Sequence, residues 1–129
     1  MSTLKVNTIQ DSSGSNASTT EQINQGRAKA WCNFNGTGTP AIRDSFNISS
    51  LTDNATGDFT LNFSNAFSNT NYCLAGTSGP NSEYIGNHLN SGGTTENYTT
   101  SSCRFTIKHV YNNNLSDAEF NEVMILGDN

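Results

Sequence analysis

The sequence predicts an all-β protein: an antiparallel, jelly-roll-like β-sandwich of about seven or eight short strands, preceded by an extended N-terminal arm. Three observations predict this fold class. Apolar and polar residues alternate in several short runs, as in FTLNF. Stretches rich in Gly, Asn, Asp and Ser separate these runs and predict turns. The chain also lacks a long segment with the periodicity of an amphipathic helix.

The N-terminal arm is expected to span residues 1–26. The segment LKVNTI at 4–9 alternates and predicts a short strand or an extended arm. Residues 11–26 are rich in Ser, Gly, Asn and Thr and are typical of a linker, with a weak helical turn near Thr20–Gln25. So few apolar side chains cannot fold alone, and we expect a partner surface to order the arm.

The compact domain is expected to span residues 27–129. It begins with a predicted strand at 28–35, and a second strand at about 41–49 follows the turn NGTGTP. The run FTLNF at 59–63 predicts a hairpin whose Gly-containing loop has several residues. Region 77–100 is interpreted as a long excursion. Further strands are expected at 71–76, 103–111 and 120–127.

The aromatic and large apolar side chains of these strands are expected to pack in the core or between subunits. They are Trp31, Phe34, Phe46, Phe59, Leu61 and Phe63. For Trp31, the only tryptophan, packing is favoured over the alternative of a platform that stacks on sugar rings.

Composition indicates a thin core and a chain that associates with itself. Hydrophobic residues make up 33% of the chain, whereas Asn, Ser and Thr together supply 52 of the 129 residues. Chains with a small core for their length often gain stability by oligomerising, and we expect a homo-oligomer. The net charge is −5 and the six basic residues are scattered, which argues against nucleic-acid binding. No apolar run is long enough to cross a bilayer, and the first residues lack a secretory signal.

The sequence offers little for catalysis, and we expect no enzyme, no metal site and no cofactor. The three cysteines are far apart and only two histidines are present, so no zinc pattern or nucleophile–base pair emerges. Asp53 and Asp58 flank a predicted turn and are expected to lie close together. Paired carboxylates can cleave glycosidic bonds, but turn chemistry alone selects Asp at such positions, and that interpretation is favoured.

Polar recognition is expected from two loop regions, 77–100 and 111–118, which offer amide, phenol and imidazole groups for adaptable hydrogen bonding. The candidate contact residues are Tyr84, Asn87, His88, Tyr98 and Asn113. Both tyrosines are expected to be exposed because they lie in polar loops.

Two long segments resemble virion proteins of tailed bacteriophages, especially marine cyanophages. The first opens with STLKVNTIQDSSG and continues through KAWCNFNGTG to the hairpin SFNISSLTDNATGD; the second is the closing MILGDN. The resemblance covers residues 2–63 and the last dozen residues. It implies a tail-fibre-like or head-decorating structural protein, usually trimeric, with no enzymatic site.

The function we expect is that of a non-enzymatic virion protein on the particle surface, tail-fibre-like, with loops suited to host-surface contact. Two alternatives stay open: a decoration or knob protein bound to the phage head, and a stand-alone carbohydrate-binding module. Expected partners are other copies of the chain in a homotrimer, tail or capsid proteins, and a host glycan or receptor. Synthesis is expected in the bacterial cytoplasm.

Overall fold

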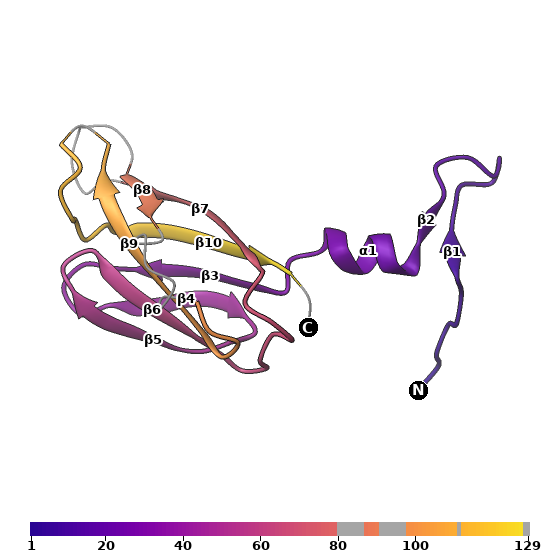
Figure 1. Cartoon of the computed structure of the whole chain (residues 1–129), viewed down its shortest axis with the longest axis horizontal. Coiled ribbons are helices and arrows are strands. Elements are labelled where there is room, and N and C mark those ends of the chain that lie inside the picture. The colour runs from indigo at the N-terminus through magenta and orange to yellow at the C-terminus, as the bar shows by residue number, and fades with distance from the viewer. Residues whose placement is uncertain (80–86, 91–97, 111, 128–129) are drawn as a thin grey trace.

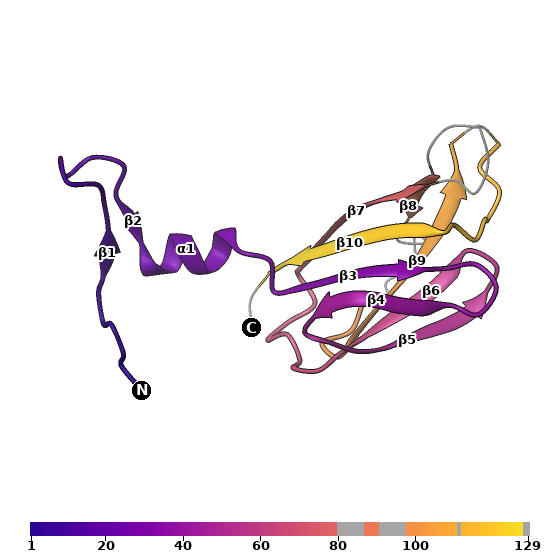
Figure 2. The same cartoon turned by 180° about the vertical axis from the view of Figure 1, so that it is seen from behind.

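The computed structural model describes residues 1–79, 87–90, 98–110 and 112–127. A narrow N-terminal arm leads into a β-sandwich, and the two parts lie end to end along the long axis of the molecule (Figures 1 and 2). The expected all-β fold class is confirmed, since the domain is built from antiparallel strands.

The arm consists of three short elements: β1 (Thr8–Ile9), β2 (Ser18–Thr19) and α1 (Thr20–Gly26). The strand expected at 4–9 is reduced to the two residues of β1, which pair with β2. The helical turn expected near Thr20–Gln25 is present as α1. Thr19 caps this helix. Its hydroxyl accepts from the backbone amide of Gln22, and the side-chain carbonyl of Gln22 accepts from the backbone amide of Thr19.

A lysine fastens the end of α1 to the domain. Lys29 is buried, and its Nζ donates to Asn24 Oδ1 of α1 at 2.6 Å. Its backbone amide donates to the Ile125 carbonyl at 2.8 Å. The helix is therefore held at the end of the sandwich and points away from it (Figure 1).

Eight strands of the described residues form one antiparallel sheet with the order β4-β3-β10-β7-β8-β9-β6-β5. They are β3 (Ala30–Asn35), β4 (Ala41–Phe46), β5 (Ile48–Ala55), β6 (Asp58–Phe63), β7 (Cys73–Gly79), β8 (Asn87–Asn90), β9 (Ser102–His109) and β10 (Phe120–Leu126). The sheet folds over itself, so that β3 and β10 face β6 and β9 (Figure 2). The order β10-β7-β8-β9 is a Greek key, the connection used in jelly rolls.

The core fills the space between the two layers. Phe34 of β3 packs edge-on against Phe59 of β6, with ring centroids 5.2 Å apart, and against Phe105 of β9 at 6.2 Å. A second aromatic group joins Phe63 to Tyr72 close to Gly127, just beyond the end of β10, with centroids 5.8 Å apart. The expected packing residues Phe34, Phe59, Leu61 and Phe63 are all buried here.

Phe46 was expected to pack in the core or between subunits, and it lies outside the core of its own chain. The strand predicted over 41–49 is in fact two strands, β4 and β5. Asn47 separates β4 from β5 with a left-handed φ of 58°, which turns the chain sharply. The register of β3 and β4 also shifts between Asn33 and Phe34. Strict alternation is thus broken, and Phe46 lies opposite Trp31 with 54% of its surface exposed.

The hairpin expected after Leu51 is present, but its loop is shorter than predicted. Ala55 pairs with Asp58, so only Thr56 and Gly57 lie in the turn. The Gly57 φ of 62° fits such a turn, because left-handed backbone is strained for residues with a side chain.

Candidate interaction surface

The two outer faces of the sandwich differ in character. The face formed by β5, β6 and β9 is polar: Asn62 donates to Ser50 and Thr52, and Asn54 donates to Thr60. Large apolar side chains are absent from the described residues that point outward on these three strands, since Phe59, Leu61, Phe63, Cys103, Phe105 and Ile107 all point inward and are buried. This face is suited to water.

The opposite outer face, formed by β4, β3, β10 and β7, is apolar. Phe46, Phe120 and Met124 are 54%, 47% and 42% exposed, and Trp31 is partly exposed beside them. We call these four side chains the apolar face. The Cζ atom of Arg43 lies over the Phe120 ring, 4.7 Å from its centre, so a cation covers one face of the ring. Exposed apolar side chains gathered on one side of a small protein mark an interaction surface.

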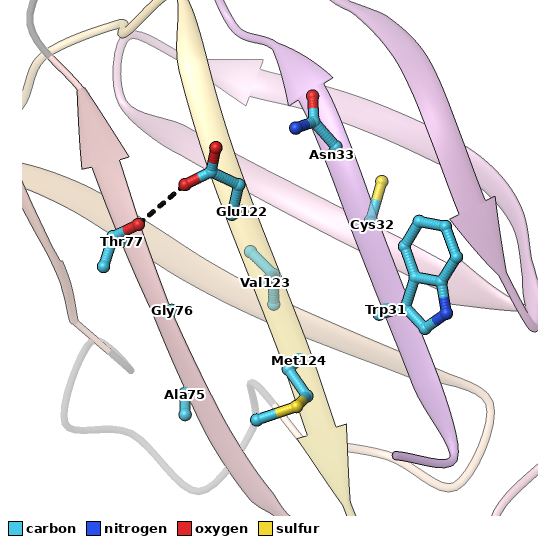
Figure 3. Close-up of a pocket in the computed structure, with 9 residues that line it drawn as sticks. All are labelled: Trp31, Cys32, Asn33, Ala75, Gly76, Thr77, Glu122, Val123 and Met124. Carbon is cyan, nitrogen blue, oxygen red and sulfur yellow. Dashed lines mark hydrogen bonds between the residues drawn. The ribbon is translucent and has the colours of Figure 1, made fainter.

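A groove of about 390 Å³ runs along β10 on this face. Figure 3 shows Trp31 of β3 on one side, Met124 and Glu122 along β10, and Thr77 of β7 on the other side. Ala75 and Gly76 leave room because their side chains are small or absent. Among the described residues that line the groove, only Glu122 is charged, and its Oε2 accepts from the Thr77 hydroxyl at 2.8 Å.

The groove follows from strand alternation. In β10, Asn121, Val123 and Ile125 point inward and are buried, so Glu122 and Met124 must point outward. In β3, Ala30, Cys32 and Phe34 take the inner positions, which leaves Trp31 and Asn33 outside. Trp31 was expected to pack in the core or at a subunit interface. Its place on the outer face excludes the core of its own chain.

The arm carries a second set of uncovered apolar side chains. Leu4 is 82% exposed, Ile9 53%, Ile23 41% and Val6 38%. Together with Arg27 they line a shallow hollow of about 340 Å³ between the first residues and α1. The hollow is lined entirely by arm residues and the adjoining Arg27, so the sandwich of the same chain does not cover it.

The loop residues predicted to make contacts are only partly described. Tyr84 lies outside the described residues. Asn87 and His88 lie in β8, where Asn87 pairs with Ser78 and with His109, and their side chains are not described. Among the described residues, the pairing with Ser78 is the one that joins β8 to β7.

Two predicted contact residues have described side chains. Tyr98 was expected to be exposed, but its ring packs on Tyr72 with centroids 5.1 Å apart and is partly buried against the core. An antiparallel β-bridge between Tyr98 and Cys103 holds Tyr98 against β9 of the sandwich. Asn113 is exposed in a tight turn with φ 60°, where its amide donates to the His109 carbonyl.

The two turn carboxylates, Asp53 and Asp58, have different surroundings. Asp58 is engaged by Arg104, whose Nε donates to Oδ1 at 2.8 Å, and by the Asn54 side chain. Hydrogen bonding to Arg104 holds the pKa of Asp58 below its usual range. A general acid needs a raised pKa, so Asp58 is unsuited to that role. Asp53 is exposed and lies opposite Phe59 in the hairpin.

Other reactive groups are also occupied or dispersed. Burial raises the pKa of the Cys32 thiol to about 11 and that of Cys103 to about 12, so neither is a ready nucleophile. Within the described ranges, no three His, Cys, Asp or Glu side chains gather as metal ligands. Nor does any helix among these residues have the length and apolar character to cross a membrane.

Sequence reasoning missed Phe120, Glu122 and Met124 as surface residues. The signal was present, because the last strand is apolar at both alternating sets of positions rather than at one. Comparisons with protein-family models, with curated proteins and with solved structures found no match to this chain.

Proposed function

We propose that this chain is a non-enzymatic structural protein on the surface of a bacteriophage particle. It is tail-fibre-like, works as a homo-oligomer and presents its polar loops to the host surface. The observation that carries the proposal is the distribution of exposed apolar side chains, which gather on the arm and on one face of the sandwich. Surfaces of this kind bind other protein chains.

The chemistry of the described residues supports a binding role over catalysis. The described residues that line the groove include one carboxylate and no histidine, and the one cysteine among them, Cys32, is buried. The ion pair of Asp58 and Arg104 stabilises the hairpin instead of activating a water molecule. The resemblance of residues 2–63 to virion proteins directs the proposal to a phage particle.

Immunogold electron microscopy of virions purified from the phage that encodes this chain tests the proposal. Antibody raised against the purified protein is expected to label intact particles, and mass spectrometry of the same particles is expected to find the chain. Label at the tail tip supports the tail-fibre-like role, and label over the head supports the decoration role. Particles that contain no copy of the chain would overturn the proposal.

A carbohydrate-binding module is the second candidate, and the position of Trp31 favours it. The indole lines an open groove beside Asn33, Thr77 and Glu122, a combination of ring and polar groups that can hold a sugar. This candidate predicts that host glycans quench Trp31 fluorescence in a saturable manner. Unchanged fluorescence across a glycan panel would exclude it.

A further inference from the structure

We infer that the groove on the apolar face receives the N-terminal arm of a second copy of this chain. The inference rests on the proposed homo-oligomeric function and names the two surfaces that join the copies. The arm supplies the apolar side chains of Leu4 and Val6. The groove beside Trp31 and Met124 receives them.

Neither surface is covered by another of the residues that the structure describes. The large apolar side chains that are exposed among the described residues fall mainly into two sets, the arm and the apolar face, and only Val110 and Leu115 lie elsewhere. The polar outer face on β5, β6 and β9 shows that the chain can build a surface for water. Two separate apolar surfaces therefore have a common explanation, which is that they cover each other.

The direction of the arm indicates that its contact with a groove is made between copies. The arm leaves the sandwich at the start of β3, and Lys29 fixes α1 through Asn24 so that the helix points away from the domain. Thus the first residues lie beyond the end of the sandwich, away from the middle of β10 where the groove lies (Figures 1 and 2). A neighbouring copy meets the arm without any change in this junction.

The charges of the arm and the groove are complementary. Glu122 is the only charged side chain that lines the groove, and Lys5 is the only charged side chain in residues 1–10. In an extended arm that turns Leu4 and Val6 into the groove, Lys5 points out of the groove, and its long aliphatic stem lets the ammonium group bend back toward the Glu122 carboxylate. Lys5 and Glu122 have opposite charges, which favours a contact between an arm and a groove. A contact between two identical grooves would instead bring two Glu122 carboxylates together.

The polar groups of the groove favour a protein segment over a sugar. Glu122 already accepts from Thr77, and Asn33 Oδ1 accepts from Arg43 Nη1 at 3.4 Å. A sugar needs several free hydrogen-bonding groups for its hydroxyls, whereas an apolar arm needs an apolar wall. Trp31, Met124 and the small residues Ala75 and Gly76 supply such a wall.

A contact between an arm and a groove joins two different surfaces, so each copy has one of each to offer. Such heterologous contacts close into a ring when the rotation between copies allows it. A ring of three copies fits the expected homotrimer. In that arrangement every arm and every groove is covered.

Complementation between two full-length variants tests this inference. The arm variant carries Leu4→Asp and Val6→Asp, and the groove variant carries Met124→Asp. All three residues are exposed, so the domain core is untouched. In sedimentation velocity, each variant alone is expected to associate at least about tenfold more weakly than the natural chain, because a charge enters an apolar contact. Matched controls are Asn7→Asp in the arm and Ser50→Asp on the polar face, which are expected to associate as the natural chain does.

The mixture of the two variants distinguishes the possible arrangements. The groove variant still has a good arm and the arm variant a good groove, so their equimolar mixture is expected to form one-to-one dimers. If identical apolar faces pack on each other, the arm variant associates normally and the mixture gives no such dimer, which overturns the inference. If the arm folds back on its own groove, the natural chain is monomeric and the arm variant alters Trp31 emission equally at every concentration, which also overturns it. Immunogold labelling of virions stays an independent test of the proposed function, since the chain can belong to a particle whatever joins its copies.

Discussion

The buried side chain of Asn121 fixes the strand that carries the groove, and its removal has a predictable cost. Its Oδ1 accepts from the Ser78 hydroxyl of β7 at 2.6 Å, and its Nδ2 donates to the carbonyls of Ala118 at 2.8 Å and of Phe34 in β3 at 3.3 Å. The residue is 0% exposed. One amide therefore joins β10 to both neighbouring strands and to the loop before it.

Asn121→Ala is expected to lower the free energy of unfolding by about 3 kcal/mol, since three hydrogen bonds at about 1 kcal/mol each are lost. The buried Ser78 hydroxyl then also lacks its acceptor. Urea unfolding followed by Trp31 fluorescence measures the change as a lower midpoint at unchanged slope. One fixed protein concentration is needed, because association raises apparent stability.

Ser78→Ala serves as the matched control, because it removes one of the three bonds and leaves the other two. It is expected to cost about 1 kcal/mol. The double variant is expected to be more stable than the sum of the single changes implies, by about 1 kcal/mol, because both single changes delete the same bond. A loss below about 1 kcal/mol for Asn121→Ala, or full additivity, would refute the reasoning.

Three further predictions concern the hairpin and the thiols. Because the ion pair with Arg104 lowers the pKa of Asp58 from 3.8, its stabilising contribution is present above pH 3.8 and is lost as the pH falls through the lower folded pKa. The Asp58→Asn variant should therefore lose less stability on acidification than the natural chain does. The difference between the two losses should not exceed about 1 kcal/mol, because the arginine is exposed, and equal losses would contradict the prediction. Gly57→Ala should destabilise the domain by more than Gly38→Ala, which should cost about 1 kcal/mol, as judged by thermal unfolding. Both have φ above 60°, but a Cβ at position 57 would meet backbone atoms at 2.6 and 2.7 Å whereas position 38 is open; equal costs would show that crowding is irrelevant. Cys73 is exposed, so a thiol reagent at pH 8 should modify one thiol per folded chain and three after unfolding, and rapid reaction of a second thiol would disprove the burial of the other two.

Local alternation made much of the fold predictable from sequence. Phe34 of β3 and Phe59, Leu61 and Phe63 of β6 were identified correctly as packing residues, because one apolar set faces the core in each strand. The break between β4 and β5 at Asn47 was not predicted. Asn47 takes a left-handed conformation that interrupts the alternation, and the sequence has no glycine there to indicate it. The burial of Tyr98 depends on Tyr72, a partner far along the chain, and local composition says nothing about such a contact.

The groove was harder to predict from the sequence than the core. Its walls come from β3, β7 and β10, which the sequence separates by many residues and which only the sheet order brings together. Trp31 was singled out for its chemistry, yet its outward direction follows from the inward placement of Cys32 and Phe34 on the same strand. Glu122 meets Thr77 only because the register of β10 and β7 sets the two residues opposite each other.

Sedimentation velocity of the natural full-length chain over a wide concentration range tests self-association most directly. The account predicts a defined assembly, three times the 13.9 kDa mass of one chain, that breaks down to monomers when Leu4 and Val6 become aspartates. A single 13.9 kDa species at every concentration would contradict it.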